Sequence, residues 1–438
     1  MASMLHGVHV PHRKSTRKVP VLRMNPPKTV EIPMSMHIGK PAIPTVKVGD
    51  LVKVGQKIGE QNGYISSPVY ASVSGKVTKI TDYLMHNGNK TQAVVIESDG
   101  EMTVADTVVA PVVNSREDLI AAIKESGIVG LGGAGFPTYV KFDVDPARID
   151  YLVINGAECE PYVTSDTITM VNRADDMAYA LRVLAQYMGI KKVIIGIENN
   201  KKTAIRTMRE MASGIQECAV SVRSLPSLYP QGGEKVLVYH TTGRVIPTGK
   251  LPIDVGCIVI NCTTLATIGA YLQNGMPLVE KCVTVDGGCV REPRNVIAPI
   301  GTAIRDLFEV CGGLKHTPAK YVYGGPMMGV TVPDDSAPVL KSSNAVLALT
   351  AKESKLPKTT NCIRCGACTN VCPFALNPAG ISHCVKVGDV KSLKQLHVDA
   401  CMECGCCSYI CPANRPLVQR NQLGKAMLRE EITKEGVK

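Results

Sequence analysis

The sequence predicts a multidomain α/β protein. Three observations lead to this prediction: a length of 438 residues, a central stretch in which strand-like and helix-like segments alternate, and two cysteine-rich runs near the C-terminus. A single hydrophobic core rarely grows beyond about 250–300 residues, so a chain of this length is expected to divide into several domains.

The central stretch, from about residue 105, carries the α/β pattern. Residues 116–126 place Leu119, Ile120 and Ile123 on one side of a helix, and 151–156, YLVING, is typical of a buried strand. The alternation continues through a helix, a strand, a helix and a strand at 174–189, 191–200, 201–214 and 256–262. Such alternation is typical of a largely parallel sheet covered by helices.

Residues 44–80 predict a small β domain. Gly49, Gly55 and Gly75 stand where its hairpins would turn, and the pattern looks like the half-barrel of biotinyl and lipoyl domains. Those domains carry a lysine between two hydrophobic residues at a hairpin tip, and this segment has no such tip. We therefore expect a barrel-sandwich scaffold without a swinging arm; the alternative is an unrelated small β domain.

Two further segments follow the α/β stretch. Residues 282–313 read as strands around a Gly-Gly turn and then a helix from about Thr302 to Val310, which resembles a small β-grasp insert of the SLBB type. Residues 331–361 are rich in Ser, Lys and Pro, and we expect a linker with one apolar strand, AVLAL.

The cysteines point to metal. The N-terminus lacks an apolar signal region, so we expect a cytosolic chain whose 17 cysteines are reduced. Eight of them form two runs, CIRCGACTNVCP at 362–373 and CMECGCCSYICP at 401–412. Both are C-x2-C-x2-C-x3-C-P, the pattern of two-cluster ferredoxins, in which the fourth cysteine of each run binds the other cluster.

This spacing assigns the ligands of two [4Fe–4S] clusters. The first cluster takes Cys362, Cys365, Cys368 and Cys411, and the second takes Cys401, Cys404, Cys407 and Cys372. Gly366 and Gly405 let the backbone approach sulfur. Zinc is the alternative, but zinc ribbons use paired C-x2-C knuckles and not two complete four-cysteine runs. Cys384 and Cys406 lie off the pattern, as bystanders or surface thiols.

The segment between the runs predicts a helical module. Apolar residues recur at roughly helical spacing at Val385, Val387, Val390, Leu393 and Leu396. A helical two-cluster ferredoxin module is therefore favoured over the strand hairpin of small ferredoxins. Two neighbouring clusters would conduct single electrons, and they need a source and an acceptor.

The formal charge of +11 raises the question of an acidic partner. No basic stripe studded with aromatic residues accompanies it, so we expect no nucleic acid. Six basic residues do concentrate at 12–28, which we interpret as a solvated arm or as an arm on an acidic partner or anionic membrane surface. No run of about 18 apolar residues predicts a transmembrane segment.

The segment GLGGAGFPTYVK, residues 130–141, contains G-x-G-x-x-G. A dinucleotide-binding Rossmann turn must follow a strand and open a helix, whereas these glycines follow a helix and precede Pro137. No Lys-Ser/Thr follows, which excludes a Walker loop. A structural glycine turn stays possible. The favoured interpretation is a loop whose backbone N–H groups face an anionic cofactor, with Lys141 reaching in and Phe136 stacking on an aromatic ring.

Four ordered segments carry a family resemblance. GLGGAGFPTYVKF resembles the flavin and NADH loop of the complex I flavoprotein subunit, and three more segments match it in order: NGAECEP at 155–161, QGGEKVLVYHTTGR at 231–244 and INCTTLATI at 260–268. With the barrel-sandwich first and the ferredoxin runs last, nearly the whole chain resembles the RnfC family, the C subunits of membrane-bound Rnf electron transport complexes.

The resemblance implies site residues. It suggests FMN binding by Gly132, Gly133, Gly135, Lys141, Asn155, Glu158 and Asn261, and contact with NADH by Phe136, Glu160 and Glu234. Asn155 and Asn261 each end a strand, so they could instead cap the turn that follows. The chain departs from the complex I pattern at Leu131, Ala157 and Lys235, which puts FMN affinity and NADH orientation in question.

The resemblance also implies a domain order. We expect a basic arm at 1–30, a barrel-sandwich at 31–104, an FMN/NADH-binding α/β domain at 105–280, an SLBB β-grasp domain at 281–330, a linker at 331–360 and a 2×[4Fe–4S] domain at 361–438.

The function that the resemblance implies is NADH oxidation. The chain would pass electrons through FMN to both clusters at the cytoplasmic face of the membrane, beside membrane subunits and a ferredoxin-cluster subunit of an ion-translocating complex. Two alternatives stay open. One is an electron-transfer scaffold with an inactive flavin site. The other is a soluble reductase for cobalamin or for an amino-acid reductase partner.

Overall fold

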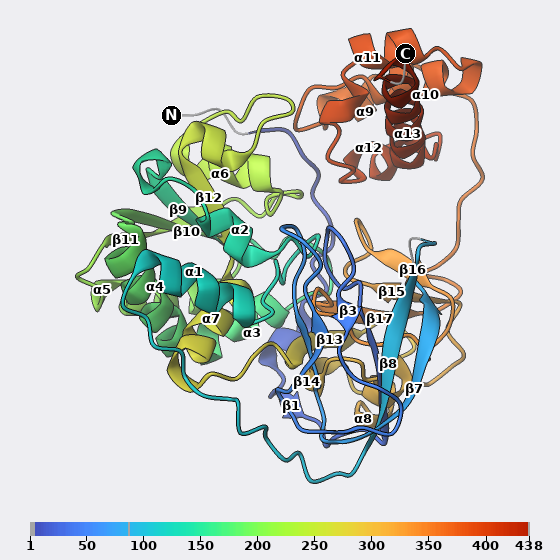
Figure 1. Cartoon of the computed structure of the whole chain (residues 1–438). Coiled ribbons are helices and arrows are strands. Elements are labelled where there is room, and N and C mark those ends of the chain that lie inside the picture. The colour runs from blue at the N-terminus through green and yellow to red at the C-terminus, as the bar shows by residue number, and fades with distance from the viewer. Residues whose placement is uncertain (1–4, 86–87, 437–438) are drawn as a thin grey trace.

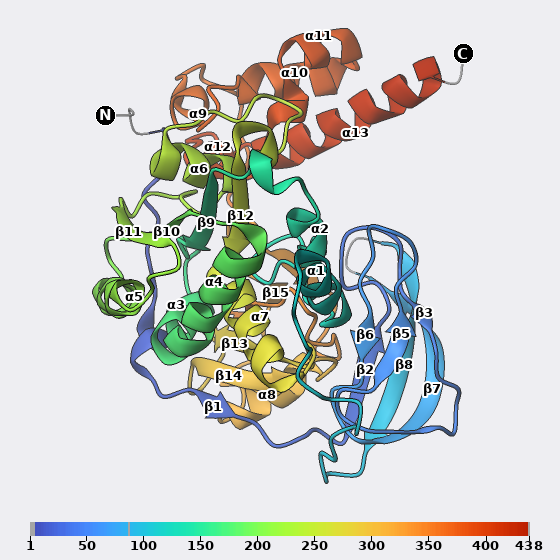
Figure 2. The same cartoon turned by 60° about the vertical axis from the view of Figure 1, so that its left-hand side comes forward.

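The structure is a computed structural model that describes residues 5–85 and 88–436. A ferredoxin-like module lies against one end of a central α/β domain, and a β barrel-sandwich lies on the side of that domain (Figures 1 and 2). A six-stranded sheet lies beside both the central domain and the barrel-sandwich (Figures 1 and 2). None of the described helices is long and apolar enough to cross a membrane.

The barrel-sandwich is built from two small antiparallel sheets. One has the order β2-β8-β7-β4, and the other β3-β5-β6. Along β7 the side chains alternate between buried and exposed over the first residues, as expected for a sheet with one face in the core. The strands are β2 (Thr29–Pro33), β3 (Ile43–Pro44), β4 (Leu51–Val52), β5 (Lys57–Glu60), β6 (Val69–Tyr70), β7 (Gly75–Leu84) and β8 (Lys90–Ser98).

The central domain has the predicted parallel sheet, in the order β11-β10-β9-β12. Its strands are β9 (Tyr151–Gly156), β10 (Lys192–Glu198), β11 (Ala219–Leu225) and β12 (Cys257–Asn261). Asn155 of β9 is the register partner of Asn261 of β12, so the two asparagines lie side by side where these strands end. Ligands of open α/β sheets bind at this carboxyl edge.

Helices cover both faces of this sheet (Figure 2). They are α1 (Arg116–Glu125), α2 (Thr138–Phe142), α3 (Ser165–Asn172), α4 (Ala174–Met188), α5 (Lys202–Ser213), α6 (Glu234–Thr242) and α7 (Cys262–Asn274), with 3-10 turns at Pro146–Arg148 and Pro252–Val255. The glycine loop lies between α1 and α2, before the first strand, as the sequence indicated.

The six-stranded sheet has the order β1-β14-β13-β17-β15-β16. It contains β1 (Leu22–Arg23), β13 (Glu280–Asp286), β14 (Arg294–Pro299), β15 (Lys320–Tyr323), β16 (Val330–Val332) and β17 (Ala345–Leu349), with α8 (Ile304–Val310) beside it. We expected a linker at 331–360, but the AVLAL strand β17 is buried throughout, between β13 and β15. A continuous apolar run suits a strand covered on both faces.

The C-terminal module is helical, as predicted. It comprises α9 (Ala367–Asn370), α10 (Pro378–Val387), α11 (Val390–Gln395), a 3-10 turn at Val398–Ala400, α12 (Cys406–Tyr409) and α13 (Leu417–Gly436). Its core gathers Ile381, Leu393, Val398 and Leu428, together with Cys384. Cys384 is therefore a buried packing residue and not a surface thiol.

The N-terminal arm runs along the central domain. Val8 forms a bridge with Tyr229, and the short 3-10 helix at Ser15–Lys18 follows. Lys14 and Thr16 are buried against the central domain. The arm is thus fixed to the chain at these two residues. Its other basic residues are exposed, and their contact with solvent, an acidic partner or an anionic membrane surface stays a prediction; they are Arg13, Arg17, Lys18, Arg23 and Lys28. Residues 1–4 lie outside the described residues.

Candidate flavin and cluster site

The glycine loop is a closed turn. Val129 bridges Pro137, and the Gly130 N–H donates to the Phe136 carbonyl at 2.8 Å. Leu131 is buried, its N–H donates to Thr264 Oγ1 at 3.0 Å, and its carbonyl accepts from Lys281 Nζ at 3.2 Å. Burial lowers the pKa of Lys281 to about 8, although Asp166 opposes the shift. The loop is thus fixed at Leu131, where the complex I pattern has an arginine.

Beyond Leu131 the loop opens outward. Gly132 and Gly133 are exposed, and no atom lies within 4 Å of the place that a Cβ of Gly133 would take. At Gly132 a Cβ would lie 2.3 Å from Asn261 Nδ2, so only glycine fits this approach. Gly135 has a φ of +70° and lies against the backbone of Met36 and His37 of the barrel-sandwich domain. Phe136 is half-buried.

The two asparagines form intramolecular hydrogen bonds. Asn261 caps α7 by accepting from Thr263 N at 2.8 Å, and its Nδ2 donates to Asp166 Oδ2 at 2.8 Å. Asn155 Nδ2 donates to the Gly232 carbonyl at 2.9 Å, and its Oδ1 accepts from Ala157 N at 3.1 Å. Both side chains therefore have the capping role that the sequence allowed. Their binding of FMN stays a prediction.

Lys141 and Glu234 come together. Lys141 Nζ lies 3.1 Å from Glu234 Oε1 and donates to the Val259 carbonyl at 2.8 Å. Both side chains are partly exposed, so each can turn toward a ligand at small cost. The structure thus joins a residue expected at FMN to one expected at NADH. Lys235, next to Glu234, reaches the Pro247 carbonyl at 3.2 Å.

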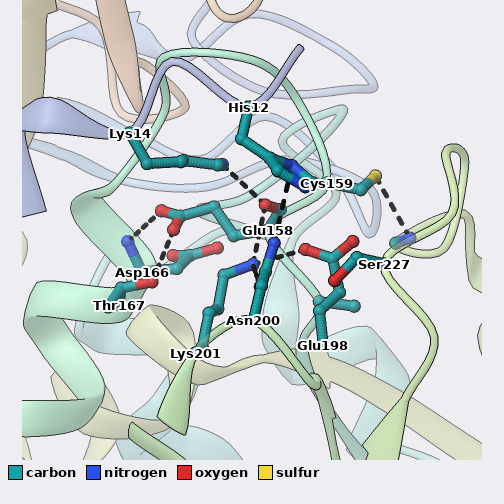
Figure 3. A network of polar contacts seen from close by, with 12 residues as sticks. His12, Lys14, Glu158, Cys159, Asp166, Thr167, Glu198, Asn200, Lys201 and Ser227 are labelled. Carbon is teal, nitrogen blue, oxygen red and sulfur yellow. Dashed lines mark hydrogen bonds and ion pairs between the residues drawn. The ribbon is translucent and has the colours of Figure 1, made fainter. Parts of the chain in front are cut away.

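Glu158 lies in a buried polar network (Figure 3). Its carboxylate accepts from Asp166 N at 2.8 Å and from Thr167 Oγ1 at 2.7 Å at the start of α3. Burial raises the pKa of Glu158 to about 7, and the nearby Lys14 opposes this shift. Lys201, buried and paired with Glu198, also donates to the Glu158 carbonyl at 3.0 Å.

Glu160 holds a different loop. Its carboxylate accepts from Met327 N at 3.0 Å and from Met328 N at 2.8 Å, and the Tyr229 hydroxyl lies 3.5 Å from it. Burial raises the pKa of Glu160, and the two amides lower it. The Met327 carbonyl in turn lies close to Gly405 of the second cysteine run. Contact of Glu160 with NADH stays a prediction.

The second cysteine set surrounds a small cavity. Cys372, Cys401, Cys404 and Cys407 all line it, together with the aliphatic and aromatic wall of the module. Cys401 Sγ accepts from Glu403 N at 3.4 Å and from Asn421 Nδ2 at 3.3 Å. Hydrogen bonds to sulfur are one means by which proteins tune cluster potentials. The chain therefore brings Cys372 to the second run, as the crossed ligand assignment requires.

The first cysteine set lies on the outside of the module. Cys362 and Cys365 are exposed, and Cys368 and Cys411 are half-buried. Thr360 N donates to the Ala413 carbonyl at 3.0 Å, which places the start of the first run beside the end of the second. In the described part of the chain, no three His, Cys, Asp or Glu side chains converge on one point as a single metal ion requires. A cubane instead binds each thiolate at a different iron.

The module and the central domain meet at the second set. The Tyr229 hydroxyl donates to the Cys404 carbonyl at 2.7 Å, and Cys406 Sγ lies 3.7 Å from the Tyr229 carbonyl. Val8, Val10 and Met327 complete this apolar contact. Cys406 is a buried contact residue and not a surface thiol. The second set is thus the inner one, beside the central domain, and the first set is the outer one.

Comparisons with known proteins follow the same domain order. Residues 2–101 match the RnfC barrel sandwich hybrid domain, 123–270 match the Nuo51 FMN-binding domain, and 282–331 match the SLBB domain. The C subunit of the Na+-translocating ferredoxin:NAD+ oxidoreductase complex of Acetobacterium woodii is 42% identical over 383 residues, which is 86% of each chain. The chain belongs to the RnfC family.

Other relatives give the same result. The C subunit of the proton-translocating ferredoxin:NAD+ oxidoreductase complex of Clostridium ljungdahlii is 39% identical over 87% of this chain and 84% of its own. The C subunit of the ion-translocating oxidoreductase complex of Rhodobacter capsulatus is 37% identical over 99% and 84%. The family predicted from the four motifs and the domain order is confirmed.

One solved structure shares the fold. The NAD+-reducing [NiFe]-hydrogenase in its H2-reduced state aligns with a TM-score of 0.51 at 18% identity, covering 72% of this chain and 63% of that one. At this identity the likeness concerns the fold alone. It agrees with the multidomain α/β architecture expected for an RnfC-family chain.

The site of this RnfC-family protein fits FMN in its chemistry. The exposed glycine backbone and Lys141 supply donors for a phosphate. Two buried hydroxyls, Thr138 Oγ1 in the residue after Pro137 and Ser165 Oγ in the residue before Asp166, have no hydrogen-bond partner within the described residues. Such hydroxyls can bind the polar atoms of a ligand.

Sequence reasoning missed Lys14, Lys201, Lys281 and Tyr229. Lys14 belongs to a basic run, which hides a buried residue among exposed ones. Lys201 directly precedes the helix α5, and Lys281 lies within the strand β13. Tyr229 precedes Pro230 just before the QGGEK motif, and its closeness to that motif was the available signal.

Proposed function

We propose that this RnfC-family protein oxidises NADH and passes the electrons through FMN to two [4Fe–4S] clusters. The observation that carries the proposal is the contact between Tyr229 and Cys404, which places the inner cysteine set directly against the domain that contains the glycine loop. The named relatives, which are C subunits of ferredoxin:NAD+ oxidoreductase complexes, support the same chemistry.

The chain supplies binding and orientation. The glycine backbone and Lys141 bind the FMN phosphate, Phe136 stacks on the rings, and Glu234 and Glu160 contact NADH. FMN held there would supply the conversion of a two-electron hydride into single electrons, which iron–sulfur clusters can accept. Hydride transfer needs no protein acid or base, so the residues act by positioning the two ring systems and excluding water.

The two cysteine sets form the path by which electrons leave the flavin site. The inner set would hold the cluster that receives electrons from the flavin side, and it consists of Cys372, Cys401, Cys404 and Cys407. The outer set presents two exposed cysteines and would hold the cluster that delivers electrons to the next protein; it consists of Cys362, Cys365, Cys368 and Cys411. That protein is a ferredoxin-cluster subunit of a membrane-bound complex coupled to ion transport, and this chain sits peripherally on its cytoplasmic face beside the membrane subunits.

The test is anaerobic reduction by NADH. Protein reconstituted with FMN and iron–sulfur clusters is mixed with NADH while the flavin absorbance and the cluster EPR signal are followed. Bleaching of the flavin followed by a reduced-cluster signal supports the proposal. Bound FMN that stays oxidised would instead favour a scaffold subunit with an inactive flavin site.

A further inference from the structure

The N-terminal arm brings a buried lysine to the turn that carries Glu158 and Glu160. Lys14 Nζ donates to three main-chain carbonyls, those of Glu158 at 2.7 Å, Glu160 at 2.7 Å and Val163 at 2.5 Å (Figure 3 shows Lys14 above Glu158). Lys14 is only 9% exposed. One ammonium group therefore uses its three N–H donors on a single turn of chain.

The shape of this turn depends on a cation at its centre. Carbonyl oxygens carry partial negative charge, so three of them aimed at one buried point repel each other unless a donor lies between them. Within the turn, Tyr162 also adopts a left-handed φ of +69°, a conformation that costs free energy for a residue with a side chain. Bonds to Lys14 offset both costs.

Neighbouring contacts set the depth to which Lys14 enters. Tyr162 N donates to the His12 carbonyl at 3.0 Å, and the Arg13 guanidinium lies 5.3 Å from the centre of the Tyr162 ring. On the other side, the Thr16 hydroxyl lies 2.6 Å from the Thr164 hydroxyl. The arm thus contacts residues 162–164 on both sides of Lys14, and these contacts keep the Lys14 side chain in its buried position.

The turn in turn aims two carboxylates at different targets. Glu158 points to the start of α3, where it accepts from Asp166 N and Thr167 Oγ1. Glu160 points to the amides of Met327 and Met328. Because Lys14 binds the carbonyls of both glutamates, a shift of its ammonium group would change both directions together.

We infer that Lys14 is a positioning residue for the flavin site, which makes the N-terminal arm a working part of that site. The inference rests on the proposed function, since it assumes that the 155–161 segment binds FMN. It assigns Lys14 no contact with the cofactor. Lys14 acts by holding the turn in the conformation in which Glu158 and Glu160 occupy their places.

The experiment compares four variants of the full-length, cluster-loaded chain. Lys14→Met removes the ammonium group and keeps the aliphatic stem, and Lys14→Gln keeps two of the three N–H donors without charge. Lys18→Met is the matched control, an exposed lysine of the same arm. Thr16→Val removes the hydroxyl contact with Thr164 and weakens the arm without touching the three carbonyls. FMN affinity is measured by quenching of its fluorescence, alongside the visible spectrum of bound flavin, iron content and thermal midpoint.

We expect Lys14→Met to weaken FMN binding about tenfold or more, because the carbonyls of Glu160 and Val163 lose their ammonium donor and buried acceptors left unpaired are strongly disfavoured. The Glu158 carbonyl keeps Lys201 as a donor in this variant. The visible spectrum of the remaining bound flavin should shift, Lys14→Gln should lie between Met and wild type, and Lys18→Met should match wild type. Iron content should not change. Thr16→Val should lower the thermal midpoint while FMN affinity stays near the wild-type value.

Three outcomes would overturn the inference. Lys14→Met could bind FMN with wild-type affinity and spectrum. FMN affinity could instead fall in proportion to the thermal midpoint in both Lys14→Met and Thr16→Val, which is the result of a purely structural arm. If Lys14→Met does not fold, equal affinity of Lys14→Gln and Lys18→Met decides against it. Failure of the wild-type chain to bind FMN at all would overturn the proposed function itself.

Discussion

The Tyr229 hydroxyl donates a hydrogen bond to the Cys404 carbonyl at 2.7 Å, and this bond joins two domains that are far apart in sequence. Tyr229 is buried, and the carboxylate of Glu160 lies 3.5 Å from its hydroxyl. One side chain therefore touches a glutamate of the central domain and the loop that carries the inner cysteine set. We expect the distance between the flavin site and the inner cysteine set to depend on this contact.

Replacing Tyr229 with Phe should weaken the contact between the central domain and the ferredoxin-like module without disturbing the flavin site or the inner cysteine set. The ring still fills its place, and only the hydroxyl bond is lost, at a cost of about 0.5–1.5 kcal/mol. We expect flavin reduction by NADH at the wild-type rate and slower reduction of the clusters, measured by stopped-flow absorbance under anaerobic conditions. If the rates of flavin reduction and of cluster reduction fell equally, Tyr229 would support the flavin site and not the contact between the two domains.

The two cysteine sets should be separable by mutation. Cys368→Ala should remove the outer cluster, with a loss of about four iron atoms, and leave flavin reduction and the inner cluster working. Cys407→Ala should remove the inner cluster and block reduction of the outer one by NADH. Iron analysis and EPR of NADH-reduced samples distinguish the two. Reduction of the outer cluster by NADH in Cys407→Ala would contradict the order of the sets.

Periodic and spaced features were predictable from the sequence. The strands YLVING and GCIVINC and the helices between them were correct because burial in a parallel sheet leaves a local apolar pattern. The two ligand sets were predicted from cysteine spacing and stay a prediction, and the structure agrees in bringing Cys372 to Cys401, Cys404 and Cys407.

Features decided by distant partners were not predictable. Lys14 resembles its basic neighbours, yet its acceptors begin 144 residues further along the chain, at Glu158. The AVLAL strand was assigned to a linker because Ser, Lys and Pro surround it, whereas its position between β13 and β15 depends on strands elsewhere. Local composition carries no information on such pairings.

Glu160→Gln tests the role of Glu160 in holding the Met327–Met328 loop. Glutamine keeps one acceptor oxygen and turns an amide toward the second backbone N–H, so one bond is replaced by two opposed donors. Such a loss costs about 1–3 kcal/mol when the group is buried. We expect slower NADH oxidation with both clusters intact, measured by steady-state kinetics together with iron content.

Glu234→Gln is the control for this variant. Glu234 is partly exposed, and among the ion pairs of the described residues it pairs only with Lys141. Loss of its negative charge should therefore change the KM for NADH and leave the Met327–Met328 loop undisturbed. If Glu160→Gln lost its clusters together with its activity, the assignment of Glu160 to the NADH side of the protein would be wrong.

Lys341 gives a pH-dependent test of the contact between the barrel-sandwich and the glycine loop. Its buried Nζ donates to Ser67 Oγ at 3.1 Å, to the Pro68 carbonyl at 2.6 Å and to the Gly127 carbonyl at 2.8 Å. Burial lowers the pKa of Lys341 from 10.5 to about 7. Lys341 thus joins the barrel domain to the chain that leads into the glycine loop.

The sign of the pH effect follows from this pKa. Between about pH 7 and 10.5 the unfolded chain holds a proton on Lys341 that the folded chain has released, so this residue makes stability rise with pH. In Lys341→Met that contribution disappears. The difference in thermal midpoint, wild type minus Lys341→Met, should therefore grow from pH 7 to pH 9, and differential scanning fluorimetry can measure it.

Lys355→Met, an exposed lysine in the same part of the chain, is the matched control. Other groups that titrate in this range, such as Glu158, are present in all three proteins and cancel in the difference. We expect no pH-dependent difference for Lys355→Met. A wild-type advantage over Lys341→Met that is constant or shrinks toward pH 9 would mean that Lys341 stays charged in the folded protein, and the barrel would then be joined to the glycine loop by a buried cation.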